Sequence, residues 1–230
     1  MVASVSFTGY RLGTGLEAST EDPASTAVTE EASAPQAENG VETAQSEQTA
    51  GDLKITAEGA PVEVCLTSDS QYRYEYDKDE YAVTTTTNGS TLEIKVTDIR
   101  PGADIGDENM IIYIPNQSYG LITIVSEGSS LILPAIDADI TVTSNASSMM
   151  LSLPSGYDKT LNYTGNASSC SLSMGDVNDV AVSARITTSA VLVPSIWPVY
   201  DMLSPDYRYT SGNGTAKINI DITSSSFTFE

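Results

Sequence analysis

The sequence predicts an all-β protein built as a single-stranded β-solenoid (β-helix), preceded by short meandering strands. From Gly51 onward, apolar and polar residues alternate with period two, which is typical of strands that bury one face. A phrase of apolar, any residue, apolar and then proline or glycine recurs in the second half, ending at Pro115, Pro134, Pro154, Gly175 and Pro194. Repeats at intervals of about 20 residues are the mark of a solenoid, so we expect coils of about that length.

The region before Gly51 differs in composition. Residues 1–16 contain the stretch VSFTGYRL, which predicts one N-terminal strand. Residues 17–50 carry acidic residues but no Lys or Arg, and are otherwise mostly small, polar or proline. Such a segment cannot bury enough apolar surface to offset the entropy lost on ordering. We expect residues 17–50 to be a disordered acidic linker or insertion, and residues 51–230 to be the folded domain.

In the first half of this domain, the alternation predicts short antiparallel or meandering strands. Apolar residues alternate within residues 53–66 and 92–96, and tyrosines alternate within residues 72–76. Asn88-Gly89 between two such runs predicts a hairpin turn.

In the second half, each coil contains two strands, and inward residues of successive coils should stack into apolar ladders. One predicted ladder is Leu133, Leu153, Met174 and Val193, and the other is Ile124, Val142, Tyr163 and Val182. Repeated Ser-Ser pairs predict corners, because hydroxyl side chains can bond a turning backbone. Residues 195–230 break the period, which predicts a C-terminal cap with a short helix around residues 199–203 and two closing strands.

Composition excludes several classes of function. Acidic residues outnumber basic ones by 31 to 10, and the net charge of −21 repels nucleic acid and anionic lipid. Histidine is absent, which removes histidine-dependent catalysis and the usual zinc sites. No apolar run approaches the roughly 18 residues of a spanning helix. We expect no nucleic-acid partner, no direct membrane insertion of this segment and no cofactor.

The two cysteines and the N-terminus say little about the compartment. Cys65 and Cys170 could form one bridge, and the sequence leaves open whether they do. Cys170 alternates with Leu172 and Met174, which is typical of a small buried hydrophobe. The first residues lack the basic and apolar regions of a signal peptide, so we expect any leader or anchor to lie outside this sequence.

The order of several segments resembles a known group. DLKITAEGAPVEV, YRYEYDKDEYAV, TLEIKV and IIYIP, followed by short coils punctuated by Ser and Gly, resemble the bacterial putative-adhesin domains of unknown function with a β-solenoid fold. The resemblance covers about residues 51–230, and the acidic insertion departs from it. It implies a right-handed β-helix-like core, export, and display outside the cell or at the cell envelope, and it defines no functional residues.

Two pairs of carboxylates are weak candidates for a metal site. Asp137 and Asp139 flank one alanine, and Asp104 and Asp107 share a loop. Paired carboxylates can bind calcium or act as acid and base. In a chain this acidic, solvated carboxylates at turns are the default, so we expect no metal site.

Aromatic residues are the candidates for contact with a partner. Exposed rings bury much area at low entropic cost. The candidates are Tyr72, Tyr74, Tyr76, Trp197, Tyr200, Tyr207 and Tyr209. The alternative is that tyrosines on strands fill a half-buried face of a sheet.

These observations favour a non-enzymatic protein of the cell surface or envelope that presents a β-solenoid for adhesion, its partner an unknown surface glycan or protein. One alternative is a protein-binding module in envelope-stress sensing. The other is a carbohydrate-active β-helix enzyme. That chemistry needs basic residues to stabilise negative charge on an acidic substrate, and in the repeat region only isolated Lys159 and Arg185 are present.

Overall fold

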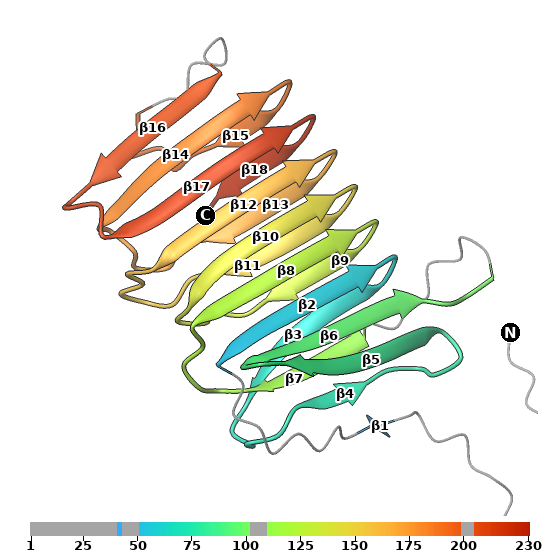
Figure 1. The fold of residues 1–230 in the computed structure, drawn as a ribbon. Coiled ribbons are helices and arrows are strands. Elements are labelled where there is room, and N and C mark those ends of the chain that lie inside the picture. The colour runs from blue at the N-terminus through green and yellow to red at the C-terminus, as the bar shows by residue number, and fades with distance from the viewer. Residues whose placement is uncertain (1–40, 43–50, 102–109, 199–204) are drawn as a thin grey trace, which may run out of the picture. The chain divides into compact units, whose positions relative to one another are not determined.

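The computed structural model describes residues 41–42, 51–101, 110–198 and 205–230 (Figure 1). The chain divides into units 1–36 and 37–230, and all described residues belong to the second. The described residues form strands and no helix, which confirms the all-β prediction. Within the described segments, therefore, no helix is long and apolar enough to cross a membrane.

The strands form two nine-stranded sheets, here called sheet A and sheet B. In spatial order, sheet A consists of β1 (Val41–Glu42), β4 (Arg73–Glu75), β7 (Met110–Pro115), β3 (Pro61–Thr67), β9 (Ser130–Leu133), β11 (Ser148–Ser152), β13 (Ser169–Ser173), β18 (Ser226–Phe229) and β15 (Ala190–Leu192). In the same way, sheet B consists of β16 (Asp206–Ser211), β14 (Val180–Thr187), β17 (Ala216–Thr223), β12 (Thr160–Asn166), β10 (Asp139–Asn145), β8 (Leu121–Glu127), β2 (Asp52–Glu58), β6 (Thr91–Asp98) and β5 (Tyr81–Asn88).

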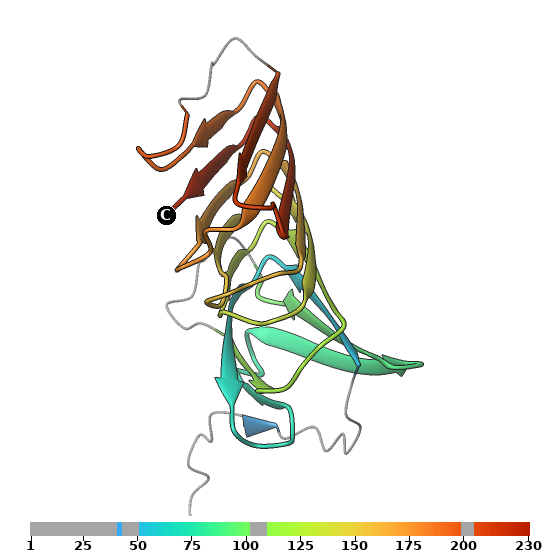
Figure 2. The same cartoon turned by 90° about the vertical axis from the view of Figure 1, so that its left-hand side faces the viewer.

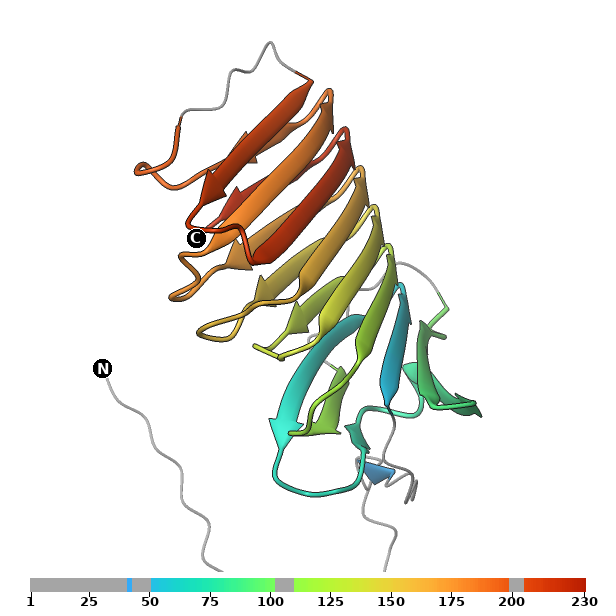
Figure 3. The same ribbon diagram turned by 60° about the vertical axis from the view of Figure 1, so that its left-hand side comes forward.

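The repeating unit is a strand of sheet B, a sharp corner and a strand of sheet A, which we call a rung. The rungs are β2–β3, β8–β9, β10–β11, β12–β13, β14–β15 and β17–β18, and neighbouring rungs pair in parallel. Figures 2 and 3 show the two sheets facing each other across the rungs. Along strands such as β10, β12 and β17, buried residues alternate with less buried ones, and the buried apolar residues of both sheets form one core.

One predicted ladder is confirmed over three rungs and wrong at the fourth. Ile124 pairs with Val142, and Val142 pairs with Tyr163. The next residue in this row is Ile220, because β17 lies between β12 and β14. Val182 instead pairs with Ile218.

The other predicted ladder points inward, but its step from Leu133 to Leu153 has the wrong register. Its step from Leu153 to Met174 follows the observed pairing, because the residues just before them, Ser152 and Ser173, are partners. Leu133, Leu153 and Met174 are buried, yet Leu133 pairs with Leu151, which then pairs with Leu172. The prolines used to align the repeats lie at different distances from the corner that precedes each strand. Pro134 directly follows β9, whereas β11 is one residue longer and Pro154 comes two residues after its end. A shift of two residues keeps the same side chains inside, so alternation alone does not reveal it.

The rungs do not follow chain order at either end, which corrects the prediction of two closing strands. The C-terminal rung β17–β18 lies between rungs β12–β13 and β14–β15 (Figure 1). Rung β2–β3 likewise lies between β6 and β7 on one side and β8–β9 on the other. β16, antiparallel to β14, forms that edge of sheet B instead. The predicted helix at residues 199–203 lies outside the described residues.

The first half of the domain is more regular than predicted. β2 and β3 are not meandering antiparallel strands but a parallel rung. Their parallel partners come from distant parts of the chain, so no period of about 20 residues betrays them. The predicted hairpin is present as β5–β6. Val41–Glu42, within the predicted linker, pairs with β4; residues 1–40 and 43–50 lie outside the described residues.

Each corner places one residue in the left-handed region and follows it with a small residue. In stack order the φ values are +70° at Gly59, +59° at Gly128, +49° at Ala146, +50° at Ala167, +51° at Ser224 and +49° at Thr188. The backbone N–H of each of the first five donates to a carbonyl of the next rung, at 2.8 to 3.0 Å. The corner thereby bonds neighbouring rungs as well as turning the chain.

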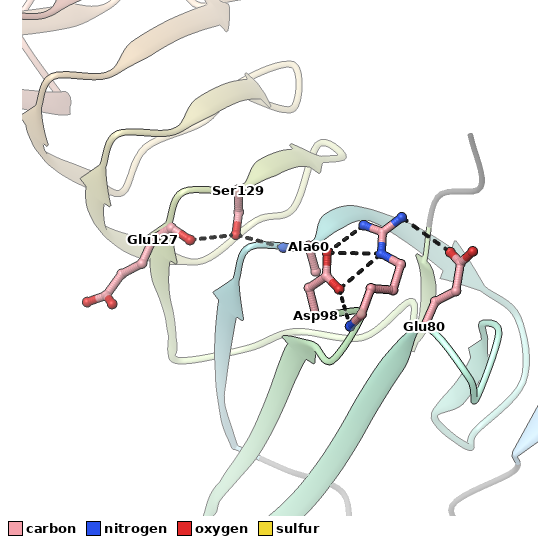
Figure 4. Close-up of polar contacts among 6 residues, drawn as sticks. Ala60, Glu80, Asp98, Glu127 and Ser129 are labelled. Carbon is pink, nitrogen blue, oxygen red and sulfur yellow. Dashed lines mark hydrogen bonds and ion pairs between the residues drawn. The ribbon is translucent and has the colours of Figure 1, made fainter. Parts of the chain in front are cut away.

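A continuous line of serines joins the same corners. The hydroxyl of Ser129 accepts the N–H of Ala60 at 3.2 Å and donates to the carbonyl of Glu127 at 3.0 Å (Figure 4). The pattern repeats through the remaining corners, where each serine N–H donates to the hydroxyl of the next: Ser129 to Ser147, Ser147 to Ser168, Ser168 to Ser225 and Ser225 to Ser189. These hydrogen bonds satisfy backbone groups that would otherwise be buried without a partner.

A group of ion pairs lies at the C-terminal end of β6. The guanidinium of Arg100 binds both carboxylate oxygens of Asp98 and lies 3.6 Å from Glu80. Figure 4 labels Asp98 and Glu80, and dashed lines mark the interactions of both carboxylates. The hydrogen bonds from Arg100 hold the pKa of Asp98 below its usual range, so the carboxylate stays ionised.

Ser168→Ala should lower the free energy of unfolding by about 1–3 kcal/mol, because the buried N–H of Ser147 loses its acceptor. Urea denaturation measures the change. Ser169→Ala is the matched control, since Ser169 is exposed and its hydroxyl, within the described part of the chain, bonds only the hydroxyl of Ser148, at 3.3 Å. Equal stability of the two variants would contradict a structural role for the line of serines.

Candidate functional site

The most developed polar surface lies on the outer side of sheet B, over β12, β17, β14 and β16. We call it the polar face. The register places its side chains in two rows, Asn162, Asn219, Ser183 and Arg208 in one and Thr164, Asp221, Arg185 and Asp206 in the other. All eight are exposed, and they line a hollow of about 330 Å³. Its size falls at the lower end of the range typical of ligand sites.

Local sequence explains why these side chains gather. In β17, Ile218, Ile220 and Ile222 point into the core, which turns Asn219 and Asp221 outward. The same alternation in β12, β14 and β16 exposes polar residues on the same side. Sequence analysis missed this surface because it placed β17 at the end of the stack. The alternation of polar and apolar residues was visible in each strand, but the sequence did not show which strands lie side by side.

Among the described residues, the amides and Arg208 of the polar face have hydrogen-bonding capacity that remains unused. The amide of Asn219 donates to the Asn162 side-chain oxygen at 2.9 Å. Arg185 lies 3.8 Å from Asp221, but 73% and 53% of their side chains are exposed. An ion pair this exposed contributes little to stability. Within the described residues, Arg208 forms no ion pair, so its planar donors face solvent.

The tyrosines predicted to bind a partner near the N-terminal side lie in the core. Tyr72 and Tyr74 are 1% and 2% exposed, and Tyr76 packs partly buried against the same core. The Tyr72 hydroxyl lies 3.4 Å from that of Tyr119, which donates to the Pro115 carbonyl at 2.9 Å. Burial raises the pKa of Tyr74 well above its ordinary value. Tyr72 and Tyr74 therefore fill the interior, as the alternative interpretation held.

The C-terminal aromatic candidates are also packed together. Trp197 is 9% exposed and stacks on Tyr209, with ring centroids 4.4 Å apart. Its ring lies 5.1 Å from that of Phe229. Tyr207 is buried and donates to the Pro198 carbonyl at 3.3 Å. Trp197 and Tyr207 are thus not exposed contact residues, and Tyr200 lies outside the described residues.

One of the acidic candidates, Asp139, caps a strand. Asp139 accepts the backbone N–H of Thr160 at 2.8 Å, which bridges two rungs of sheet B. Asp52 and Asp179 make the equivalent bonds to Leu121 at 2.9 Å and Thr215 at 3.0 Å. Asp137 is exposed, while Asp104 and Asp107 lie outside the described residues. Among the described residues, no group of three or more His, Cys, Asp or Glu is placed to hold a metal ion.

A second hollow, of about 690 Å³, follows the corners of the rungs. Its walls are backbone and small residues, including the exposed Ser130, Ser148, Ser169 and Ser226. The buried serines beneath them already donate and accept within the protein. This surface therefore offers a ligand less unused hydrogen-bonding capacity than the polar face does.

The cysteines are both free, so the question that the sequence left open is answered. Cys170 is buried in the core, as its alternation predicted, and burial raises the pKa of its thiol. Cys65 is partly exposed on β3, where burial and the neighbouring Glu63 raise its pKa. A raised pKa disfavours the thiolate form of both side chains.

The structure is similar to the crystal structure of a putative cell adhesion protein from Clostridium sporogenes, with a TM-score of 0.60 and 8% sequence identity. The alignment covers 83% of this chain and 97% of that one. A putative adhesin from Bacteroides fragilis gives a TM-score of 0.35 and 8% identity over 84% of this chain and 98% of that one. No family model and no curated protein matches the sequence. At 8% identity, the similarity to the Clostridium sporogenes protein is a similarity of fold.

Trp197→Ala should lower the free energy of unfolding by about 3–5 kcal/mol, the range for truncating a large buried ring. Chemical denaturation measures it. Ile196→Ala is the matched control, because the neighbouring Ile196 is 85% exposed and its loss should change stability by about 0.5 kcal/mol or less. If Trp197→Ala were as stable as the wild type, the ring would not be part of the core, and Trp197 would again be a candidate binding residue.

Asp179→Asn should reduce stability at neutral pH and matter less in acid. Hydrogen bonds from Thr215 lower the pKa of Asp179, so the ionised carboxylate stabilises the fold above the unfolded pKa of about 3.9. That contribution disappears as pH falls through the lower folded pKa. Urea midpoints of the two proteins should therefore differ at pH 7 and converge below about pH 4. A difference that grows in acid would contradict this role.

Proposed function

We propose that this chain is a non-enzymatic protein of the cell envelope or cell surface that presents a β-solenoid for adhesion, with the polar face as its binding surface. The observation that carries the proposal is the polar face itself. It exposes amide, guanidinium, carboxylate and hydroxyl groups on neighbouring strands, around a hollow of ligand size. The pairing of β12, β17, β14 and β16 holds these groups in fixed rows.

The architecture supports display. Parallel rungs joined by corners and stacked through two sheets are the arrangement expected of a β-solenoid, with right-handed coils as part of the proposal. Such a stack is a stiff platform, because each rung bonds its neighbours along both sheets. The likeness to the cell adhesion protein from Clostridium sporogenes favours the same use, at the surface or envelope of a cell.

The chemistry of the polar face favours a ligand rich in hydroxyl groups, and we propose a surface glycan. Asn162, Asn219 and Ser183 both donate and accept hydrogen bonds, and Arg208 offers a planar pair of donors. Neighbouring strands lie about 4.8 Å apart, similar to the length of one sugar unit in an extended chain. The protein's net charge of −21 disfavours a highly anionic polysaccharide.

The absence of catalysis is part of the proposal. The sequence contains no histidine, and the carboxylate of Asp139, one of the acid–base candidates, already accepts a backbone N–H. On the polar face, Asp221 is paired with Arg185. These carboxylates are placed to hold structure or ligand.

A glycan array with the purified chain tests the proposal, and Arg208→Ala tests the site. A hydrogen bond from a charged group is worth about 1.5–3 kcal/mol, so the variant should bind its glycan at least about tenfold more weakly while melting like the wild type. The dissociation constant is measured by titration with the glycan that the array identifies.

Lys54→Ala is the matched control. It removes one positive charge from the outer face of the same sheet, where Lys54 pairs with Glu93 at 3.4 Å, far from the polar face in the order of strands. Its affinity should equal that of the wild type. Equal losses in both variants would indicate a general effect of charge and remove the polar face as the site.

A further inference from the structure

The four edges of the two sheets are not alike. The edges of sheet A are β1, of two residues, and β15, of three. One edge of sheet B is β16, which has six residues and carries Asp206 and Arg208. Short strands and charges are the usual ways of preventing an edge from pairing with another chain. These three edges are therefore protected.

The fourth edge, β5, has neither protection. It contains eight residues, Tyr81–Asn88 with the sequence YAVTTTTN, and no charged residue, proline or glycine. Within the described residues it pairs only with β6. Figure 2 shows the β5–β6 hairpin projecting away from the stacked rungs. Residues 84–88 are exposed to solvent. Four of the residues of β5 are threonines, which favour the extended conformation that pairing with another strand requires.

The hairpin register shows which backbone groups are free. Gly89 and Ser90 form the turn, so Asn88 and Thr91 are the closing bonded pair. In an antiparallel pair the bonded residues alternate, so Thr84 and Thr86 bond β6. The N–H and carbonyl groups of Val83, Thr85 and Thr87 therefore face away from β6.

We propose that β5 pairs antiparallel with β5 of a second copy of this chain. The occupant is a second copy because the edge is self-complementary about a two-fold axis. With Thr85 opposite its own counterpart, Val83 lies opposite Thr87, and each strand offers the donors and acceptors that the other needs. Pairing joins two copies of sheet B into one continuous sheet through their β5 edges.

Charge favours self-association at this strand over the rest of the surface. The chain carries a net charge of −21, so most surfaces of two copies repel each other. β5 itself has no charge, and on β6 the two outward charges, Glu93 and Lys95, are opposite in sign. A dimer joined through β5 would also present two polar faces, which raises avidity for a repeating ligand.

Sedimentation equilibrium of the full chain over a wide concentration range tests the proposal. The wild type should show a reversible monomer–dimer equilibrium. Thr85→Pro removes an outward N–H and should raise the dissociation constant at least tenfold. Thr85→Val is the matched control, since it keeps the backbone donor and the branched shape and should dimerise like the wild type.

Thr85→Asp keeps the test decisive if the proline variant does not fold. Two carboxylates directly opposite each other repel, so this variant should be monomeric with an unchanged circular dichroism spectrum. A wild type that is monomeric at every concentration would overturn the proposal. So would dimers of wild-type affinity in both Thr85→Pro and Thr85→Asp. Neither result tests whether a single polar face binds a glycan, so the two proposals fail separately.

Discussion

The hydrogen bonds between corners are the constraint on which the rest of the structure depends. A residue without glycine's freedom pays for the left-handed region with about 1–2 kcal/mol, and Ala146, Ala167, Thr188 and Ser224 all adopt it. At Ala146, Ala167 and Ser224 the cost is offset because that conformation aims the N–H of the corner residue at the next rung. At all four corners it also places the following serine in the line of hydroxyls. Since each corner joins a strand of sheet B to a strand of sheet A, it fixes the register of both sheets at once.

The order of the rungs gives both ends of the described domain the same construction. β2–β3 and β17–β18, its first and last rungs along the chain, are each held between neighbours on both sides. The sheet edges at β5, β15 and β16 come instead from segments that lie between these two rungs along the chain, and the fourth edge is β1. An interior position satisfies the main-chain groups of the terminal rungs, while the partners of those rungs lie far away in sequence. Pairing strands that are distant in sequence requires a long loop to close, and its entropy is lost before the contacts form. Proteins with many such contacts typically fold slowly.

The sequence shows which side chains face inward, but only partly which of them meet. Ile124, Val142 and Tyr163 were aligned correctly because β8, β10 and β12 are consecutive in both chain and space. Leu153 was placed two residues out of register, an error that alternation with period two cannot detect. The polar face was missed for a topological reason, since β17 brings its amide and carboxylate between strands that precede it in the chain. Trp197 was taken for a surface residue because its loop gave no sign of Tyr209 and Phe229 beneath it.

The separation of inward from outward residues also explains how the fold is shared at 8% identity. A rung needs apolar residues at alternate positions and a small residue at the corner, and many sequences meet those conditions. These conditions do not apply to the outward positions, so the side chains of the polar face can change without disturbing the ladders of buried residues. A shared fold therefore does not specify a ligand, and under the proposed function specificity comes from outward residues such as Arg208 and Asn219. The edge at β5 follows the same logic, because its exposed threonines support no core and its lack of charge is not required by the fold.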